Sequence, residues 1–138
     1  MLKVMIVDDD KSVIECLSQL IPWQEIGCAL IASASNGQEG YNLAVEQSPD
    51  LIICDIVMPV MDGTALCRRI YETMSDVVFI FLSAYEDFST AQVALQYHAR
   101  DYILKPINRG KIDYITSLLH DLSVQREKTA WYMRLLHD

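Results

Sequence analysis

The sequence lacks the features that mark membrane and secreted proteins. No apolar run approaches the roughly 20 residues that a transmembrane helix needs. The chain begins Met1-Leu2-Lys3 and then enters a strand-like run, without the basic and apolar regions of a signal peptide. We therefore expect a protein that neither spans a membrane nor carries a secretion signal.

Paired cysteines are also missing. The four cysteines, Cys16, Cys28, Cys54 and Cys67, form no C-x-x-C pair, and no histidine lies at ligand spacing from them. This pattern disfavours a zinc site and a disulfide framework, because both need closely spaced or paired thiols. We expect reduced, mostly buried thiols that pack as small apolar groups, and a cytoplasmic protein.

Basic residues are scarce. The chain has 11 lysines and arginines against 19 aspartates and glutamates, which gives a net charge of −8. Residues 1–107 hold 6 basic and 15 acidic groups, a net of −9, whereas residues 108–138 are nearly balanced. No basic patch supports nucleic-acid binding by this chain alone. Clustered acids suit a divalent metal ion better.

What is present is an alternation of apolar runs and helical patterns. The 138 residues, 51% of them hydrophobic, suit one globular domain. Such alternation predicts a parallel sheet with helices on both faces and right-handed crossovers, a (βα)5 doubly wound α/β fold. The expected strands are residues 3–7, 29–33, 51–55, 77–82 and 101–104, and the expected helices are 11–20, 38–47, 64–73, 88–97 and one from Asn108 onward.

The last helix changes character along its length. Ile112, Ile115, Leu119 and Leu122 keep a spacing typical of a packed helix face, and this pattern fails at Arg126. We expect one domain over residues 1–122 and the start of a linker helix over residues 123–138, leading to a missing output domain. A C-terminal helix that folds back on the domain fits equally well, and the sequence leaves both open.

Polar side chains stand where four of the predicted strands end. Asp8 and Asp9 follow the first strand, Asp55 ends the third, Ser83 follows the fourth and Lys105 follows the fifth. Because parallel strands deliver their carboxyl ends to one edge, these groups should meet there. Crowded carboxylates suit Mg²⁺, which takes oxygen ligands, and a metal beside a lysine suits phosphoryl transfer.

These features together resemble the receiver domain of two-component response regulators over about residues 1–122. The resemblance rests on Asp8-Asp9, Asp55, Met58-Pro59 with Asp62-Gly63, Ser83-Ala84 and Lys105-Pro106, each after the appropriate strand. It implies a flavodoxin-like sheet of strand order 2-1-3-4-5. It also implies a signalling module that catalyses only its own phosphorylation and dephosphorylation, rather than an enzyme acting on other substrates.

The resemblance assigns roles at the site. Asp55 would be the phosphoacceptor, and Asp9 and Asp55 would bind Mg²⁺ (or Mn²⁺) directly, together with the backbone carbonyl of Val57. Asp8 would act on the metal largely through water. Val57 and Tyr85, each two positions beyond a site residue, should border the pocket and influence access of water.

Three further residues belong to the implied mechanism. Ser83 would bond the phosphoryl oxygens and Lys105 would pair with them. Tyr102 would be the switch aromatic, which rotates inward when Ser83 moves toward the phosphate. The Lys105-Pro106 bond is cis in the family, and the sequence does not settle it here.

The resemblance also implies partners. A sensor histidine kinase would donate the phosphoryl group, and the switched surface of the fourth helix, fifth strand and fifth helix could form a homodimer. Residues 22–27 and 83–88 resemble receivers that precede an AraC-type helix-turn-helix domain, so the absent output would bind DNA and regulate transcription. His98 stands where the family often has glycine, which affects details of the switch surface.

Three further functions fit parts of the sequence. Residues 6–13 resemble the first motif of haloacid-dehalogenase-like phosphatases, in which Asp8 would be the nucleophile. The chain could also be a pseudo-receiver that only mediates protein contacts, or a stand-alone receiver that binds a separate target. The phosphatase and the receiver differ in which aspartate carries the phosphoryl group.

Overall fold

The computed structural model describes residues 1–84, 92, 96, 97 and 99–137, and this part of the chain contains one five-stranded sheet. All the strands pair in parallel, in the order β2-β1-β3-β4-β5. The predicted order and sheet type are confirmed, with strand ends within one residue of expectation. The strands are β1 (Leu2–Val7), β2 (Cys28–Ala34), β3 (Leu51–Asp55), β4 (Val78–Ser83) and β5 (Asp101–Leu104).

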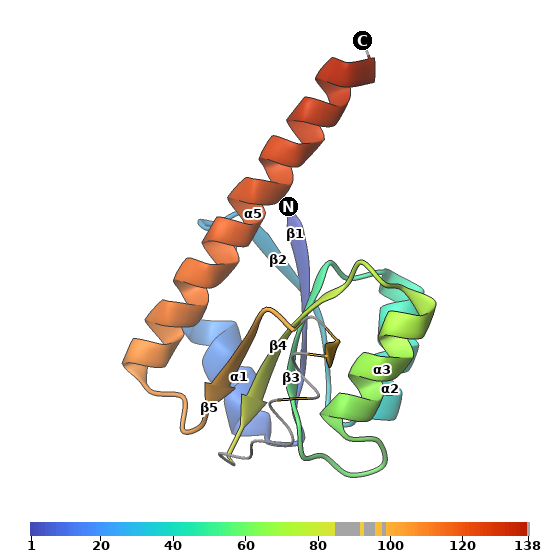
Figure 1. Ribbon diagram of the computed structural model, residues 1–138. Helices are drawn as coiled ribbons and strands as arrows, with labels where there is room; N and C mark the ends of the chain where they lie inside the picture. The colour runs from blue at the N-terminus through green and yellow to red at the C-terminus, as the bar shows by residue number, and fades with distance from the viewer. Residues whose placement is uncertain (85–91, 93–95, 98, 138) are drawn as a thin grey trace.

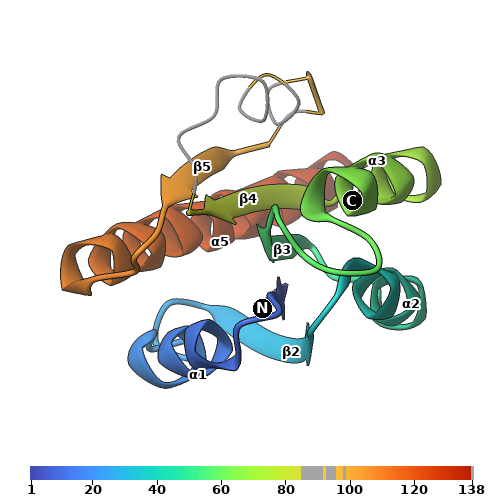
Figure 2. The same cartoon turned by 90° about the horizontal axis from the view of Figure 1, so that it is seen from below.

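Helices cover both faces of the sheet, as the predicted doubly wound fold requires. Helices α1 (Lys11–Leu20) and α5 (Arg109–His137) pack on one face, and α2 (Gly37–Gln47) and α3 (Gly63–Thr73) pack on the other (Figures 1 and 2). The helix predicted over residues 88–97 falls almost entirely outside the described residues.

Strand β3 shows why the fold follows from the sequence. It is the central strand, and all five of its residues are buried. Leu51 and Ile53 join the core under α1 and α5, whereas Ile52 and Cys54 join the core under α2 and α3. A strand covered on both faces needs a continuous apolar run rather than an alternating one. Cys28, Cys54 and Cys67 are buried free thiols, and Cys16 is a half-buried one.

Helix starts at the carboxyl edge of the sheet are fixed by side-chain caps. The Asp10 carboxylate accepts a 2.9 Å hydrogen bond from the backbone N–H of Ser12 and so caps α1, as predicted. Asp62 caps α3 by accepting from the Ala65 N–H at 2.8 Å. Such caps satisfy N–H groups that a helix leaves free at its first turn. They also hold in place the two loops that flank the end of β3.

Helix α5 is the longest element and runs well past the end of the sheet (Figure 1). Its buried residues are Ile112, Ile115, Leu118, Leu119 and Ser123, and every residue from 124 to 137 is exposed. The proposed boundary near Leu122 stays a prediction, and contacts with the domain continue to Arg126. Although α5 has 29 residues, neither it nor another helix of the described chain has the length and apolar character that crossing a membrane requires.

Candidate functional site

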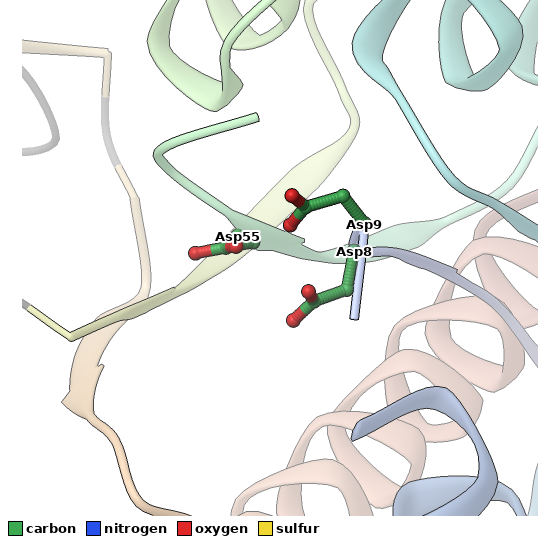
Figure 3. A group of neighbouring side chains, drawn as sticks. All are labelled: Asp8, Asp9 and Asp55. Atoms are coloured by element: carbon green, nitrogen blue, oxygen red, sulfur yellow. The ribbon is translucent and has the colours of Figure 1, made fainter. Parts of the chain in front are cut away.

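Three carboxylates gather where β1 and β3 end. Asp8 and Asp9 follow β1, Asp55 is the last residue of β3, and oxygen atoms of all three lie within 4.8 Å of one another (Figure 3). Asp8 is fully buried and Asp55 is 5% exposed, whereas Asp9 is exposed. The sheet therefore brings the predicted acidic residues together, with one of them open to solvent.

Lys105 lies across this group and supplies its cation. Its Nζ atom lies 3.0 Å from Asp8 Oδ2 and 3.3 Å from Asp55 Oδ2. The Lys105 backbone N–H donates a 2.7 Å hydrogen bond to the Ser83 carbonyl, which continues the β4–β5 pairing and fixes where the side chain starts. The Lys105-Pro106 peptide bond is cis. One ammonium group is therefore shared by two buried carboxylates.

Ser83 and Tyr102 occupy neighbouring strands beside the site. Ser83 ends β4 and is 1% exposed, and Tyr102 is paired with Phe81 in the register of β4 and β5 and is half-buried. The Ser83 carbonyl accepts from Lys105, so a movement of Ser83 would be felt at the start of the β5–α5 loop. Val57, beyond β3, is exposed. Tyr85 and His98 lie outside the described residues.

Burial dominates the electrostatics of the site. It raises the pKa of the Asp55 carboxyl to about 6, and the neighbouring Asp8 charge adds to the effect. Burial likewise raises the pKa of Asp8, against the Asp10 N–H, which donates a 2.9 Å hydrogen bond to Asp8 Oδ1. Burial acts to lower the pKa of Lys105, but its contacts with Asp8 and Asp55 outweigh this, so that pKa is raised. The two buried acids are thus incompletely compensated.

The residues at this edge fit a hard divalent cation. Carboxylate oxygens are the ligands that Mg²⁺ takes, and Mn²⁺ shares that preference. Asp8 Oδ2 is buried, and within the described residues no donor is directed at it with hydrogen-bond geometry; its contact with Lys105 is an ion pair without that alignment. A metal ion beside Asp8, Asp9 and Asp55 would supply the charge that this oxygen and its neighbours lack.

Gly63 is a structural part of the site that sequence reasoning noted only as a motif letter. Its N–H donates a 2.7 Å hydrogen bond to the Ile56 carbonyl, and a Cβ atom there would lie 2.2 Å from the Asp55 backbone oxygen. The start of α3 therefore lies directly against the end of β3, which only glycine permits. The Asp62-Gly63 pair in the sequence was the available signal.

The backbone of Asp10 is a second contribution that was missed. The sequence indicated Asp10 as a helix cap, whereas its N–H also fixes the orientation of Asp8. A pocket of about 470 Å³ adjoins this region, between α1 and the β5–α5 loop. Cys16 and Lys105 are among its lining residues, so the lysine is reachable from the α1 side of the molecule.

Comparison with known proteins agrees with this geometry. Residues 4–116 match the response regulator receiver domain family. The chain is 34% identical over 134 residues to the uncharacterized transcriptional regulatory protein YesN of Bacillus subtilis, covering 94% of this chain and 36% of that protein. It is 34% identical over 139 residues to the transcriptional regulatory protein HptR of Staphylococcus aureus, covering 100% and 54%. The chain thus spans about a third to a half of these relatives.

Solved structures show the same likeness. The receiver domain of AraT, a response regulator from Geobacillus stearothermophilus, superposes with a TM-score of 0.83 at 30% identity, covering 92% of this chain and 99% of that one. A CheX–CheY–BeF3–Mg²⁺ complex from Borrelia burgdorferi gives a TM-score of 0.74 at 28% identity, covering 89% and 88%. From the family match and the fold, we conclude that this chain belongs to the response regulator receiver domain family.

Proposed function

We propose that this chain is a phosphoacceptor receiver domain in which Asp55 takes a phosphoryl group from a sensor histidine kinase. The observation that carries the proposal is the shared lysine: Lys105 Nζ lies 3.0 Å from Asp8 and 3.3 Å from Asp55, beside three carboxylates within 4.8 Å. Such a set of charges holds a phosphoryl group between a metal ion and a fixed ammonium. The BeF3 and Mg²⁺ of the similar CheY complex support the same use of this edge.

The chemistry of transfer divides among a few residues. The P–N bond of a phosphohistidine breaks, its electron pair stays on the imidazole, and a P–O bond forms to a carboxylate oxygen of Asp55. Mg²⁺ or Mn²⁺, held by Asp9, Asp55 and the Val57 carbonyl and through water by Asp8, would supply positive charge to the phosphoryl oxygens. Lys105 neutralises the remaining charge, and positioning with neutralisation makes up most of phosphoryl-transfer catalysis. The chain would catalyse only its own phosphorylation and dephosphorylation.

The response to phosphorylation follows from the strand register. Ser83 is a buried hydroxyl at the end of β4, and the phosphoryl oxygens on Asp55 would draw it closer. Tyr102 lies on β5 opposite Phe81, two residues before Ser83, so space released by Ser83 opens beside it. We propose that Tyr102 then rotates inward and biases the surface formed by the fourth helix, β5 and α5 toward a second state.

The surroundings of the domain follow from its relatives. Both YesN and HptR are named as transcriptional regulatory proteins and are longer than this chain. We propose that α5 continues, beyond about residue 122, as a linker to a DNA-binding output domain of AraC type, and that the whole protein is cytoplasmic. The surface of the fourth helix, β5 and α5 would then control the output domain, including through homodimer formation.

Incubation with acetyl phosphate and Mg²⁺, followed by intact mass measurement and reductive trapping, tests the assignment. We expect one phosphoryl group on Asp55, dependent on the metal, and none in Asp55→Asn. Asp50→Asn is the matched control, because Asp50 is another largely buried aspartate at the opposite end of β3, away from the site. It should accept phosphate like the unchanged protein.

The remaining outcomes of this experiment point to different functions. A phosphoryl group on Asp8 with rapid turnover would support the haloacid-dehalogenase-like phosphatase and contradict the receiver mechanism. Absence of any modification, with Mg²⁺ present and with either acetyl phosphate or a histidine kinase as donor, would leave a pseudo-receiver. Equal loss in Asp55→Asn and Asp50→Asn would point to a general folding defect and would remove the support for Asp55.

A further inference from the structure

The end of α5 is a helix with nothing packed on it. Residues 124–137 are all exposed, and the last contact of α5 with the domain is made by Arg126. The 11 residues from 127 to 137 extend about 16 Å beyond that contact at the rise of an α-helix. Isolated helices of this length are marginal in water. The extension nevertheless carries large apolar residues, which are Trp131, Tyr132, Met133, Leu135 and Leu136.

One stripe on this extension has the spacing of a helix–helix seam. Val124, Lys128, Trp131 and Leu135 follow one another at intervals of four, three and four residues. The three apolar members are 40%, 53% and 53% exposed. Intervals of this kind place side chains on one face of a helix and are typical of the a and d positions of a coiled coil. A lysine at a single a position lowers stability and restricts the number of helices that associate.

The domain lies on the other side of the helix from this stripe. In the same heptad register, Ser123 and Arg126 take the c and f positions, opposite the a/d face. The Ser123 hydroxyl donates a 2.6 Å hydrogen bond to the Ile26 carbonyl, and Arg126 lies 3.0 Å from Asp50. These contacts fix the rotation of α5 as it leaves the domain. The stripe therefore points away from the body of the molecule and can be reached by another helix.

We propose that this stripe pairs with the same stripe of a second copy of the chain, as a short parallel two-helix seam. A seam needs a helical partner with matching spacing, and a second copy provides one. In the parallel arrangement, Lys128 lies beside Glu127 of the second copy at the adjoining g position, so the charges are complementary. The longer relatives YesN and HptR favour this orientation, because both chains would then continue from the same end.

This pairing is separate from the phosphorylation proposed above. The seam uses none of the residues at the carboxyl edge of the sheet, and it lies on the extension rather than on β5. We expect it to form without phosphate, metal or an intact Asp55. The contact is short, so we expect a weak association that a covalent trap reveals more clearly than sedimentation alone.

Disulfide trapping tests the seam with a control that the helix itself provides. Helix axes 8–10 Å apart, with Cα atoms about 2.3 Å from each axis, bring a-position Cα atoms to roughly 4–5 Å and f-position Cα atoms to roughly 13–15 Å. A disulfide requires about 4.4–6.8 Å. Leu135→Cys, at a, should form a disulfide dimer, and Met133→Cys, at f, should not, although both residues are about half exposed. Both are made in a Cys16→Ser background, because Cys16 is the accessible native thiol.

We expect the Leu135→Cys dimer to form at least about tenfold faster than the Met133→Cys dimer, because only the a position meets the disulfide geometry. Trp131→Glu added to Leu135→Cys should abolish it, and Asp55→Asn should leave it unchanged. Equal rates at positions 133 and 135, or faster reaction at 133, would overturn the seam. Cross-links between Leu135→Cys and Val124→Cys chains, without self-linking of either, would overturn the parallel arrangement. A dimer lost in Asp55→Asn would show dependence on the phosphorylation site and contradict the proposal.

Discussion

Two aspartates bracket β3 and are used in opposite ways. Asp50, just before the strand, accepts a 2.8 Å hydrogen bond from the Lys3 N–H and pairs with Arg126 at 3.0 Å, while its backbone bonds to Lys3 and Val78. Asp55, at the other end, is buried beside Asp8 and shares the single ammonium of Lys105 with it. One carboxylate is matched by its own partners, and the other is not.

The difference separates structural from functional charge. The amino edge of the sheet uses Asp50 to tie β1, β3 and α5 together, with each polar group satisfied. The carboxyl edge concentrates buried negative charge that raises the pKa of Asp55 to about 6. A fold retains such a group where its instability serves binding, here of a cation and a phosphoryl group. Substitutions at the two edges should therefore change stability in different directions.

The largest effect should come from crowding the carboxyl edge. Gly63→Ala places a Cβ atom against the Asp55 backbone oxygen, where it would approach to 2.2 Å. Because backbone rather than a flexible side chain is in the way, we expect a loss of about 3 kcal/mol in unfolding free energy. Urea denaturation measures it. Gly110→Ala is the control: its Cβ atom meets only Asn108 Oδ1 at 3.6 Å, and it should be neutral or stabilising.

The second effect compares the two aspartates directly, with the same substitution at each. Without metal, Asp55→Asn removes a buried charge whose pKa is about 6 rather than 3.8, so it should raise the unfolding free energy by about 1–3 kcal/mol. Asp50→Asn keeps an acceptor for Lys3 but loses the charge facing Arg126, so it should lower that free energy by about 0.5–1 kcal/mol. Urea denaturation in EDTA gives both. A loss of stability in Asp55→Asn would contradict the distinction between the edges.

Sequence reasoning reached the fold and the site residues because both depend on local patterns. Apolar runs set the strands, and parallel topology carried Asp8, Asp9, Asp55, Ser83 and Lys105 to one edge. What it missed depends on contacts between distant parts of the chain. Nothing in a local pattern pairs Arg126 with Asp50 or Ser123 with Ile26, because each contact requires the packed position of α5. The close approach of Gly63 to β3 likewise appears only once the loop between them is folded.

The pH dependence of stability should report the carboxyl edge. The pKa values of Asp55 and Asp8 are raised in the folded protein, so the folded state binds more protons than the unfolded state between about pH 4 and pH 7. Their contribution to stability is present at low pH and is lost as pH rises through about 6. In EDTA, the unfolding free energy should therefore fall by about 1–2 kcal/mol between about pH 5 and pH 7.5.

Two changes should flatten this profile. Mg²⁺ competes with protons for the same oxygens, so the decrease should shrink when the metal is added. Asp55→Asn should remove most of the decrease in EDTA, and Asp50→Asn should keep it, because Asp50 lies outside the acidic group. Urea denaturation across the pH range gives all the profiles. A decrease that persists in full in Asp55→Asn would assign it to groups elsewhere in the protein.

The smallest effect should come from the amino edge, at Arg126. Its side chain is 56% exposed, so its ion pair with Asp50 is screened by water, and Arg126→Gln should cost less than about 1 kcal/mol. Ser123→Ala should cost more, about 1–2 kcal/mol, because the Ser123 hydroxyl bonds the Ile26 carbonyl in a buried setting. A double-mutant cycle of Arg126→Gln with Asp50→Asn isolates the pair. A coupling energy above about 1.5 kcal/mol would show that Asp50 depends on Arg126 as strongly as a buried charge does, and the contrast between the two ends of β3 would then fail.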